Sequence, residues 1–475
     1  MTEFLIANMA PIIFASMIIF LLVGFPVAFA LAANGVVFGL IGIKLGLLGP
    51  QLFQALPDRI YGVMANETLL AVPFFTFMGL ILERSGMAED LLDTIGQLFG
   101  PIRGGLAYAV IIVGALLAAT TGVVAASVIS MGLISLPIML RYGYDKRLAS
   151  GVIAASGTLA QIIPPSLVLI VMADQLGKSV GDMYAGAFVP GLVLTSLYVV
   201  YVIIVSFVKP HWVPALPPEA RSLRGSKLML RVLTTLVPPL MLIFLVLGTI
   251  FLGIATPTEG GAMGATGALI MAVVRKRLNL KLLKQAMEST AKLTTFVLFI
   301  LIGARVFSLT FYGVDGHLWV EHLLVNLPGG QLGFLIVVNL LVFFLAFFLD
   351  YFELSFIVVP LLGPVAEKLG IDLIWFGVLL GVNMQTSFLH PPFGFALFFL
   401  RSVAPASVKS SDIYWGAVPF VFIQILMISL VIAFPQMVTF GLDKGNNVDA
   451  NSIKIEIPAY DYDNSEPEQP VEQTK

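Results

Sequence analysis

QIIPPS (residues 161–166) and FLHPPF (residues 388–393) each place a proline pair in the middle of a long apolar run. A proline inside a helix removes a backbone hydrogen bond and clashes with the preceding turn, at a cost of about 3 kcal/mol or more. Pro164 and Pro391 are 227 residues apart (391 − 164 = 227). Two apolar helices that are broken in the same way indicate one structural device used twice.

The composition is that of a membrane protein. Of the 475 residues, 58% are hydrophobic and 11% are charged, and the mean hydropathy is +0.98. In a soluble globular domain roughly a quarter of the residues are charged. The chain has no cysteine, which excludes disulfides and thiolate metal sites. Its net charge of −2 gives no reason to expect a nucleic-acid partner.

Apolar stretches long enough to cross the hydrocarbon core predict ten membrane spans. They cover residues 8–24, 26–44, 66–84, 147–174, 185–208, 229–252, 257–276, 290–312, 373–404 and 414–438. Two further stretches, 106–141 and 332–368, are too long for one span and have a small or polar interruption near the centre. We interpret them as re-entrant hairpins, which are tolerated at membrane depth when they are buried in protein or line a wet cavity. A linker at 209–228 and a disordered acidic tail at 441–475 complete the predicted organisation.

The positions of lysine and arginine orient this topology. Most of them fall in loops on one side of the predicted spans, whereas the other side carries only Lys44, Arg59, Lys178 and Lys368 apart from the tail. The positive-inside rule makes the first side cytoplasmic. The hairpin at 106–141 then opens from the cytoplasm, and the hairpin at 332–368 opens from outside.

Several sequence matches recur in the same order at nearly the offset of the proline pairs. DMYAGAFVP (182–190), for example, matches DIYWGAVP (412–419). These matches predict two related halves, residues 1–208 and 229–440, each with five spans and one hairpin. An odd number of spans turns the second half upside down, and inverted repeats with broken helices are typical of secondary transporters. The predicted fold is an all-α polytopic membrane protein built from an inverted repeat.

The hairpin turns and the helix breaks carry polar residues that suit a cation. The first hairpin turns at ATTGVVAAS (119–127) and the second at LDYFELS (349–355). We expect each turn to face the broken helix of its own half, at Ser156–Pro165 and Asn383–Pro392. Hydroxyls, amide oxygens and freed backbone carbonyls can hold Na+ at such a place. The alternative for the first turn is a plain turn in a helical hairpin.

Ionisable residues at membrane depth are costly and are functional by default. Asp350 and Glu353 lie at that depth, unless the turn reaches water. Arg305 is interpreted as a contact for an anionic substrate, as a partner of one of these acids, or as a snorkelling side chain. Glu259 either caps the start of a helix or has a functional role, and His390 either makes a structural hydrogen bond or relays a proton. The candidate substrate contacts are Arg305, Thr121, Asp350 and His390.

Four short amphipathic stretches are predicted to lie in the membrane interface, because they are too short to span. They cover residues 49–65, 88–100, 275–289 and 317–327. Such arms could brace a fixed scaffold while the hairpin regions move.

Five motifs closely resemble, in the family's order, the large membrane subunit of the TRAP (tripartite ATP-independent periplasmic) transporters: NETLLAVPFFTFMGLILERSGM (66–87), ATTGVVAASVISMG (119–132), ASGTLAQIIPPSLVLIVMA (155–173), GIATPTEGGA (253–262) and HPPFGFALFFL (390–400). The resemblance covers roughly residues 5–440. It implies Na+-coupled uptake of an organic acid across the bacterial inner membrane by an elevator motion, in a fold related to the divalent anion–sodium symporters. It also implies two partners, a small four-helix membrane subunit and a periplasmic substrate-binding protein. It implies no cofactor besides the coupling ion Na+ and no enzymatic activity.

In this family the sodium sites form at the hairpin tips and the helix breaks. Carried over, the resemblance implies a first Na+ site at Thr120, Thr121, Gly122, Ser127, Ser156, Thr158, Gln161 and Pro164. It implies a second Na+ site at Asp350, Ser355, Asn383, Gln385, Ser387 and Pro391. The sequence departs from the family pattern in its first tip (119–122), which is often richer in serine, and in its bulky, acidic second tip (350–353). It also departs at Leu389-His390, where a smaller polar pair is common.

Three other functions remain open from the residues alone. The first is a stand-alone ion-coupled carboxylate symporter of the divalent anion–sodium type, which needs no binding protein. The second is a membrane-embedded enzyme that uses Asp350, Glu353 and His390, although catalysis gives no reason to duplicate a broken helix upside down. The third is a passive channel.

Overall fold

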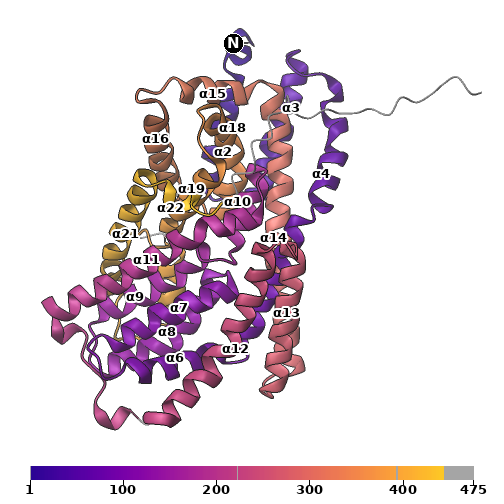
Figure 1. Ribbon diagram of the computed structural model, residues 1–475. Helices are drawn as coiled ribbons and strands as arrows, with labels where there is room; N and C mark the ends of the chain where they lie inside the picture. The colour runs from indigo at the N-terminus through magenta and orange to yellow at the C-terminus, as the bar shows by residue number, and fades with distance from the viewer. Residues whose placement is uncertain (1, 222, 392–393, 443–475) are drawn as a thin grey trace, which may run out of the picture.

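The protein is helical throughout the residues that its computed structural model describes, which are 2–221, 223–391 and 394–442 (Figure 1). Six of the helices, α3, α8, α11, α12, α14 and α21, are long and apolar enough to cross a membrane singly. Shorter apolar helices and bent pairs make up the other predicted spans. The predicted tail falls almost entirely outside the described residues.

The first half begins with helices α1 (Thr2–Ala7), α2 (Met9–Val23), α3 (Val27–Lys44), η1 (Pro50–Ala55), α4 (Leu56–Met64), η2 (Thr68–Leu70), α5 (Ala71–Arg84) and α6 (Met87–Phe99). It continues with the hairpin helices α7 (Gly105–Thr121) and α8 (Val124–Arg141), then α9 (Lys146–Thr158), η3 (Leu159–Gln161), α10 (Leu167–Leu176) and α11 (Val180–Val208). The linker contains η4 (Pro210–Trp212) and η5 (Pro218–Ala220).

The second half repeats this order. It contains α12 (Gly225–Phe251), α13 (Pro257–Val274), α14 (Leu280–Gly313), α15 (Gly316–Val325), α16 (Gly330–Leu345), α17 (Tyr351–Ile357), α18 (Val359–Lys368), α19 (Leu373–Gln385), η6 (Thr386–Phe388), α20 (Phe395–Val403), α21 (Ser410–Ala433) and α22 (Gln436–Thr439). The two predicted broken helices are confirmed: α9 and α10 are separated at the first proline pair, and α19 and α20 at the second.

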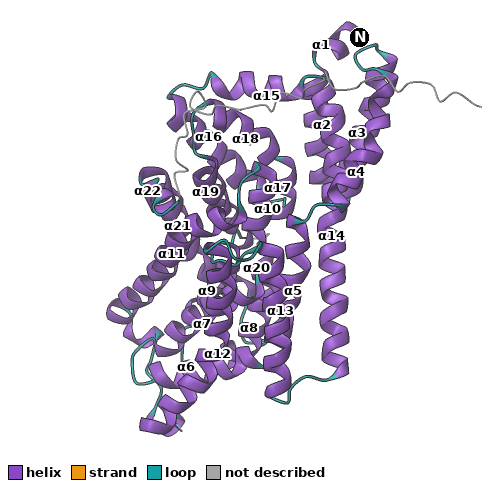
Figure 2. Cartoon of the chain, turned by 45° about the vertical axis from the view of Figure 1, so that its right-hand side comes forward, coloured by secondary structure: helices purple, strands orange, loops and turns teal. Residues whose placement is uncertain are grey.

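One predicted interfacial arm is wrong. Residues 280–289 do not form a separate helix, because Asn279 caps the start of α14 and the helix continues for 34 residues. At 1.5 Å per residue α14 is about 51 Å long, which exceeds the ~30 Å hydrocarbon core. Figure 2 shows α14 running through most of the height of the molecule. The other predicted arms correspond to η1 with α4, to α6 and to α15, and α15 turns by 118° from α16.

The two hairpins lie at opposite ends of the molecule. Helices α6, α7 and α8 occupy the lower part of Figures 1 and 2, whereas α15, α16 and α18 occupy the upper part. Helix packing shows the same exchange, because α3 packs on α14 while their counterparts α13 and α5 pack on each other. A two-fold relation requires such exchanged pairs. The inverted repeat stays a prediction, which these contacts support.

Close helix packing depends on glycine at the main contacts. A side chain on Gly303 of α14 would lie 2.4 Å from the carbonyl oxygen of Ala28 in α3. A side chain on Gly151 of α9 would lie 2.1 Å from the carbonyl oxygen of Gly416 in α21. Membrane helices use small residues in this way to bring backbones together. The two broken helices lie at the centre, and every residue of α9 from Leu148 to Thr158 is buried.

Candidate functional site

A cavity of about 240 Å³ lies where the two hairpin turns meet the two helix breaks. We call it the central cavity. It is lined by Gly122, Val123, Val124 and Ala125 of the first turn, Gln161 and Leu167 of the first break, Asp350, Tyr351 and Phe352 of the second turn, Phe388, Phe395 and Phe399 beside the second break, and Leu293 and Phe296 of α14. Each turn thus lies against a break, and both breaks face one space.

The first turn is held against the start of α10 by a glycine. Gly122 caps α7 with a φ of +57°, a conformation that glycine adopts without steric cost. A side chain at Gly122 would lie 3.2 Å from Cγ of Leu167, the first residue of α10. Thr120 and Thr121 end α7, but their side chains lie outside the described part of the structure. Ser127, in the first turn of α8, is buried.

Gln161 is the side chain of the first break that is free to bind a ligand. It is 1% exposed and lines the central cavity. Neither its amide oxygen nor its amide nitrogen has a hydrogen-bond partner among the described residues. A buried polar group without a partner costs about 1–3 kcal/mol. A bound ion, water or substrate would remove that cost, so Gln161 has the properties of a ligand-binding residue.

The other predicted residues of the first site differ in what they offer. The hydroxyl of Ser156 is buried without a described partner, but it lies against α7, where a side chain at Gly114 would be 2.6 Å from the Cβ of Ser156. The break frees backbone carbonyls, and the hydroxyl of Ser166 donates to one of them, the carbonyl of Gln161, at 2.5 Å. Pro164 precedes Pro165 through a cis peptide bond. The described side-chain atoms therefore assign Gln161, more than Ser156, to the cavity.

The second turn is organised by a reciprocal capping box. The Oδ1 atom of Asp350 accepts a hydrogen bond from the Glu353 backbone N–H at 2.9 Å, and Oε2 of Glu353 accepts one from the Asp350 N–H at 3.0 Å. The pattern D-x-x-E before an apolar helix is the sequence signature of this motif. The sequence therefore contained a signal for the cap that the prediction of a cation site did not use. One oxygen of each carboxylate stays outside these two bonds.

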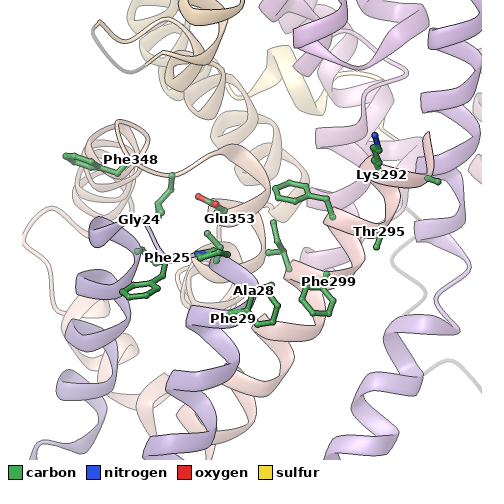
Figure 3. A pocket seen from close by; sticks show the side chains of 16 residues that line it. Gly24, Phe25, Ala28, Phe29, Lys292, Thr295, Phe299, Phe348 and Glu353 are labelled. Carbon is green, nitrogen blue, oxygen red and sulfur yellow. The ribbon is translucent and has the colours of Figure 1, made fainter. Parts of the chain in front are cut away.

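The two acids of this turn face different cavities. Asp350 lines the central cavity, whereas Glu353 lines a larger cavity of about 740 Å³ between the α2–α3 turn, α14 and the second hairpin turn. We call this larger cavity the lateral cavity. Figure 3 shows Glu353 in this lateral cavity, close to Phe25 and other aromatic side chains. Phe296 lines both cavities, and its ring centre is 6.3 Å from that of Phe352. The Phe296–Phe352 pair therefore stands between the two cavities.

The second break is more heavily hydrogen-bonded than the first. The Nδ2 atom of Asn383 donates to the backbone oxygen of Asn339 at 2.8 Å and to its Oδ1 at 2.9 Å, which leaves Oδ1 of Asn383 without a described partner. The buried hydroxyl of Ser387 also lacks a described partner. Ser355 instead faces two sulfur atoms, of Met172 at 3.5 Å and Met384 at 3.7 Å. Pro391 is half-buried, and Pro392 lies outside the described residues.

Two predicted ligands, Thr158 and Gln385, bind each other. The Nε2 atom of Gln385 donates to Oγ1 of Thr158 at 3.0 Å. The same Oγ1 is 3.5 Å from Nε2 of Gln424, which also donates to the hydroxyl of Tyr198 at 3.0 Å. Sequence reasoning missed Gln424 and Tyr198, because nothing in their local pattern distinguishes them from other residues of apolar helices.

His390 lies between aromatic rings. It is 1% exposed, and its ring centre is 4.3 Å from those of Phe343 and Phe347. Neither ring nitrogen has a hydrogen-bond partner among the described residues. The structural hydrogen bond expected for this histidine is therefore absent from the described part of the chain, and His390 does not line the central cavity.

Arg305 lies apart from both acids. It lines a cavity of about 280 Å³ that it shares with Arg59 of α4, Gln175 of α10 and Ser308 of α14. We call this the outer cavity, because it lies at the end of α14 that leads into α15. No ion pair joins Arg305 to an acid of the described residues, so the predicted pairing with Asp350 or Glu353 is not formed. The four candidate substrate contacts do not share one site.

Glu259 has the structural role that was one of its two interpretations. Its carboxylate accepts from the Thr256 backbone N–H at 2.8 Å, and Oγ1 of Thr256 accepts from the Glu259 N–H at 3.2 Å. This capping box confirms that Glu259 caps the start of α13.

Residues 14–437 match the family model described as tripartite ATP-independent periplasmic transporter, DctM component. The C4-dicarboxylate TRAP transporter large permease protein DctM of Pseudomonas aeruginosa is 31% identical over 394 residues, which cover 82% of this chain and 89% of that protein. The ectoine TRAP transporter large permease protein TeaC of Halomonas elongata is 28% identical, over 92% of this chain and 99% of that protein.

A solved structure shares the fold at much lower identity. The crystal structure of the YdaH transporter of Alcanivorax borkumensis superposes with a TM-score of 0.57 and 15% identity, over 82% of this chain and 89% of that one. At that identity the likeness concerns the fold alone.

Proposed function

The chain belongs to the tripartite ATP-independent periplasmic transporter family as a DctM component, and we propose that it imports an organic acid across the inner membrane by coupling it to Na+. The family consists of transporter components and not of enzymes, and this chain is its multi-pass membrane permease. We further propose that it works with a small four-helix membrane subunit and a periplasmic substrate-binding protein. The word tripartite in the family's description supports this assembly.

The central cavity is the observation that carries the proposal. Two hairpin turns and two helix breaks meet there, and breaks of this kind free backbone carbonyls that can coordinate a cation. On the first side the cavity offers the unpaired amide of Gln161, and on the second side it offers the carboxylate of Asp350. We assign the first Na+ site to the Gly122 turn with Gln161, and the second to the Asp350 turn with Asn383 and Ser387 of the second break.

An elevator motion is supported by the division of the helices into two groups. Helices α3, α5, α13 and α14 pack on one another in exchanged pairs, while α9 packs on both α8 and α21. Figures 1 and 2 show α3, α13 and α14 on the opposite side of the molecule from α9, α11 and α21. We propose that the first group is the fixed scaffold and that the hairpins and broken helices move against it.

An organic acid as substrate is supported by two observations. Relatives at 28–31% identity carry the names of C4-dicarboxylate and ectoine transporters. The outer cavity holds two arginines and no acidic residue in its lining, and guanidinium groups bind carboxylates well because their donors match the two carboxylate oxygens. We propose that an anionic substrate passes this cavity on its way to the central one.

Binding of radioactive Na+ to the purified complex of this chain with its small subunit tests the ion assignment. Gln161→Leu should weaken Na+ binding roughly tenfold or more, since it removes an amide oxygen that coordinates the ion, a contact comparable in strength to a hydrogen bond with a charged group, about 1.5–3 kcal/mol. Gln54→Leu, at an exposed glutamine of η1, is the control and should bind as the wild type does. Equal Na+ binding by wild type and Gln161→Leu would remove Gln161 from the site.

Reconstitution tests the assembly. The substrate is found first, by thermal-shift screening of the binding protein against organic acids. Uptake into proteoliposomes should then require the binding protein, the small subunit and an inward Na+ gradient. Robust uptake by this chain alone would favour a stand-alone symporter, and uptake that ignores the Na+ gradient would favour a channel.

A further inference from the structure

A buried polar network joins the two helix breaks. The Thr158 hydroxyl donates to the Ala155 backbone oxygen at 2.8 Å and accepts from Nε2 of Gln385 at 3.0 Å. Nε2 of Gln424 approaches the same hydroxyl at 3.5 Å and donates to the Tyr198 hydroxyl at 3.0 Å. Thr158, Gln385, Gln424 and Tyr198 are all 0% exposed. A hydroxyl has one donor and two acceptor positions; the donor and one acceptor position of the Thr158 hydroxyl are occupied, and the other acceptor position faces Gln424.

The two partners of the central bond occupy equivalent places in the two halves. Gln385 follows Thr158 by 227 residues (385 − 158 = 227), which is the separation of the proline pairs. Thr158 is the last residue of α9 before the first break, and Gln385 is the last residue of α19 before the second. Tyr198 and Gln424, which extend the network, lie on the counterpart helices α11 and α21. Equivalent residues touch each other at the axis of a two-fold arrangement.

Each partner of the bond lies next to a candidate ion site. Gln161 follows Thr158 through the single turn η3, so a ligand on Gln161 fixes the turn that begins at Thr158. At the second break, Gln385 directly precedes Thr386 in the chain. The hydroxyl of Thr386 donates to the Asn383 backbone oxygen at 2.7 Å. The Thr158–Gln385 bond is therefore a direct side-chain hydrogen bond between the two breaks. Side-chain bonds in such a buried place are directional and strong, because no water competes for them.

We propose that the Thr158–Gln385 hydrogen bond couples the two Na+ sites, so that an ion at one break orders the other break and the two ions bind cooperatively. Thr158 and Gln385 then act as positioning residues and not as ligands. This inference rests on the proposed Na+ sites. Its consequence is that the chain is not held with one ion bound, which would otherwise let an ion cross without substrate.

Saturation binding of radioactive Na+ to the complex of this chain with its small subunit tests the proposal. The wild type should bind with a Hill coefficient above 1 and approaching the number of coupled sites, about 2. Thr158→Val and Gln385→Leu should lower the Hill coefficient to about 1 and raise the half-saturating concentration about 5-fold or more, with the number of bound ions unchanged. Thr158→Ser, which retains the hydroxyl, should restore the wild-type Hill coefficient.

A matched control separates this coupling from a general loss of stability. Thr195 of α11 also donates its hydroxyl to a backbone oxygen, that of Gly191, at 2.8 Å. Thr195→Val should therefore leave the Hill coefficient unchanged.

The other outcomes decide against the proposal in distinct ways. A wild type that binds two ions with a Hill coefficient of about 1 overturns it, as do Val and Leu variants that retain the wild-type Hill coefficient. Loss of one bound ion in Thr158→Val or Gln385→Leu would make that residue a ligand, which also overturns the positioning role. Absence of saturable Na+ binding in the wild type would refute the proposed function itself, and in that case the coupling has no sites to join.

Discussion

Gly122→Ala is expected to weaken Na+ binding through the backbone of the first hairpin turn. Gly122 caps α7 with a φ of +57°, and a residue with a Cβ in that left-handed conformation pays roughly 1–2 kcal/mol. Its new Cβ would also lie 3.2 Å from Cγ of Leu167, so the Leu167 side chain must move by a few tenths of an ångström. If the turn relaxes when no ion is bound, the strain is present only in the ion-bound state and therefore lowers the affinity for Na+.

A cost of 1–2 kcal/mol corresponds to a roughly 5- to 30-fold loss of Na+ affinity. Gly177→Ala is the matched control. Gly177 caps α10 with a φ of +62°, and nothing lies within 4 Å of the Cβ that alanine would add. With Na+ bound both variants should lose stability, because they share the same backbone strain, and Gly122→Ala also crowds Leu167. Only Gly122→Ala should also bind Na+ more weakly.

Thermal unfolding and binding of radioactive Na+, measured on the same complexes with the small subunit, separate the two effects. Equal Na+ affinity in Gly122→Ala and Gly177→Ala would refute the placement of the first ion site at this turn. A large loss of affinity in Gly177→Ala would instead show that Na+ binding reports general stability.

Two further pairs of substitutions test the charged residues. Asp350→Ala and Asp372→Ala each remove the N-cap of a helix, α17 and α19 respectively, and each should cost about 1 kcal/mol of stability. Only Asp350→Ala should reduce the number of bound Na+ ions, and a full complement of ions in that variant would exclude Asp350 as a ligand. Arg305→Gln should raise the external substrate concentration at half-maximal uptake about tenfold or more, because it removes a charge-assisted hydrogen bond to the substrate. Arg59→Gln should also raise this concentration. Wild-type uptake constants in both arginine variants would remove the outer cavity from the substrate path.

Much of the fold follows from local sequence pattern. The proline pairs at 164–165 and 391–392 predict both broken helices, because a proline cannot continue the backbone hydrogen bonding of the preceding turn. The apolar stretches predict most of the spanning helices within about five residues, because a span must be long enough to cross the core, but the span at 290–312 misses the first ten residues of α14. The arm at 275–289 is wrong for a related reason. An amphipathic pattern looks the same on an interfacial helix and on the end of a span that extends beyond the membrane.

The candidate site was less predictable, since it depends on which residues meet in space. The turns and breaks come together as expected, but the pattern does not say that Asp350 and Glu353 face different cavities. Nor does it place Arg305 beside Arg59, which is far away in the chain. The offset of 227 residues between the proline pairs was visible in the sequence. That two residues related by this offset touch depends on where the axis lies, which no local pattern encodes.

Both halves place a hairpin turn against a broken helix, but different side chains line the two breaks. At the first break the amide of Gln161 is unpaired, whereas at the second break Asn383 is bound to Asn339 and Gln385 to Thr158. The proposed first site would therefore use a neutral amide together with backbone oxygens, and the proposed second site would add the charge of Asp350. A carboxylate attracts a cation at longer range than an amide dipole does, because the attraction between charges falls off only as the inverse of distance. The second site should consequently hold its ion more strongly, and a bond that couples the two sites would let that stronger site help to fill the weaker one.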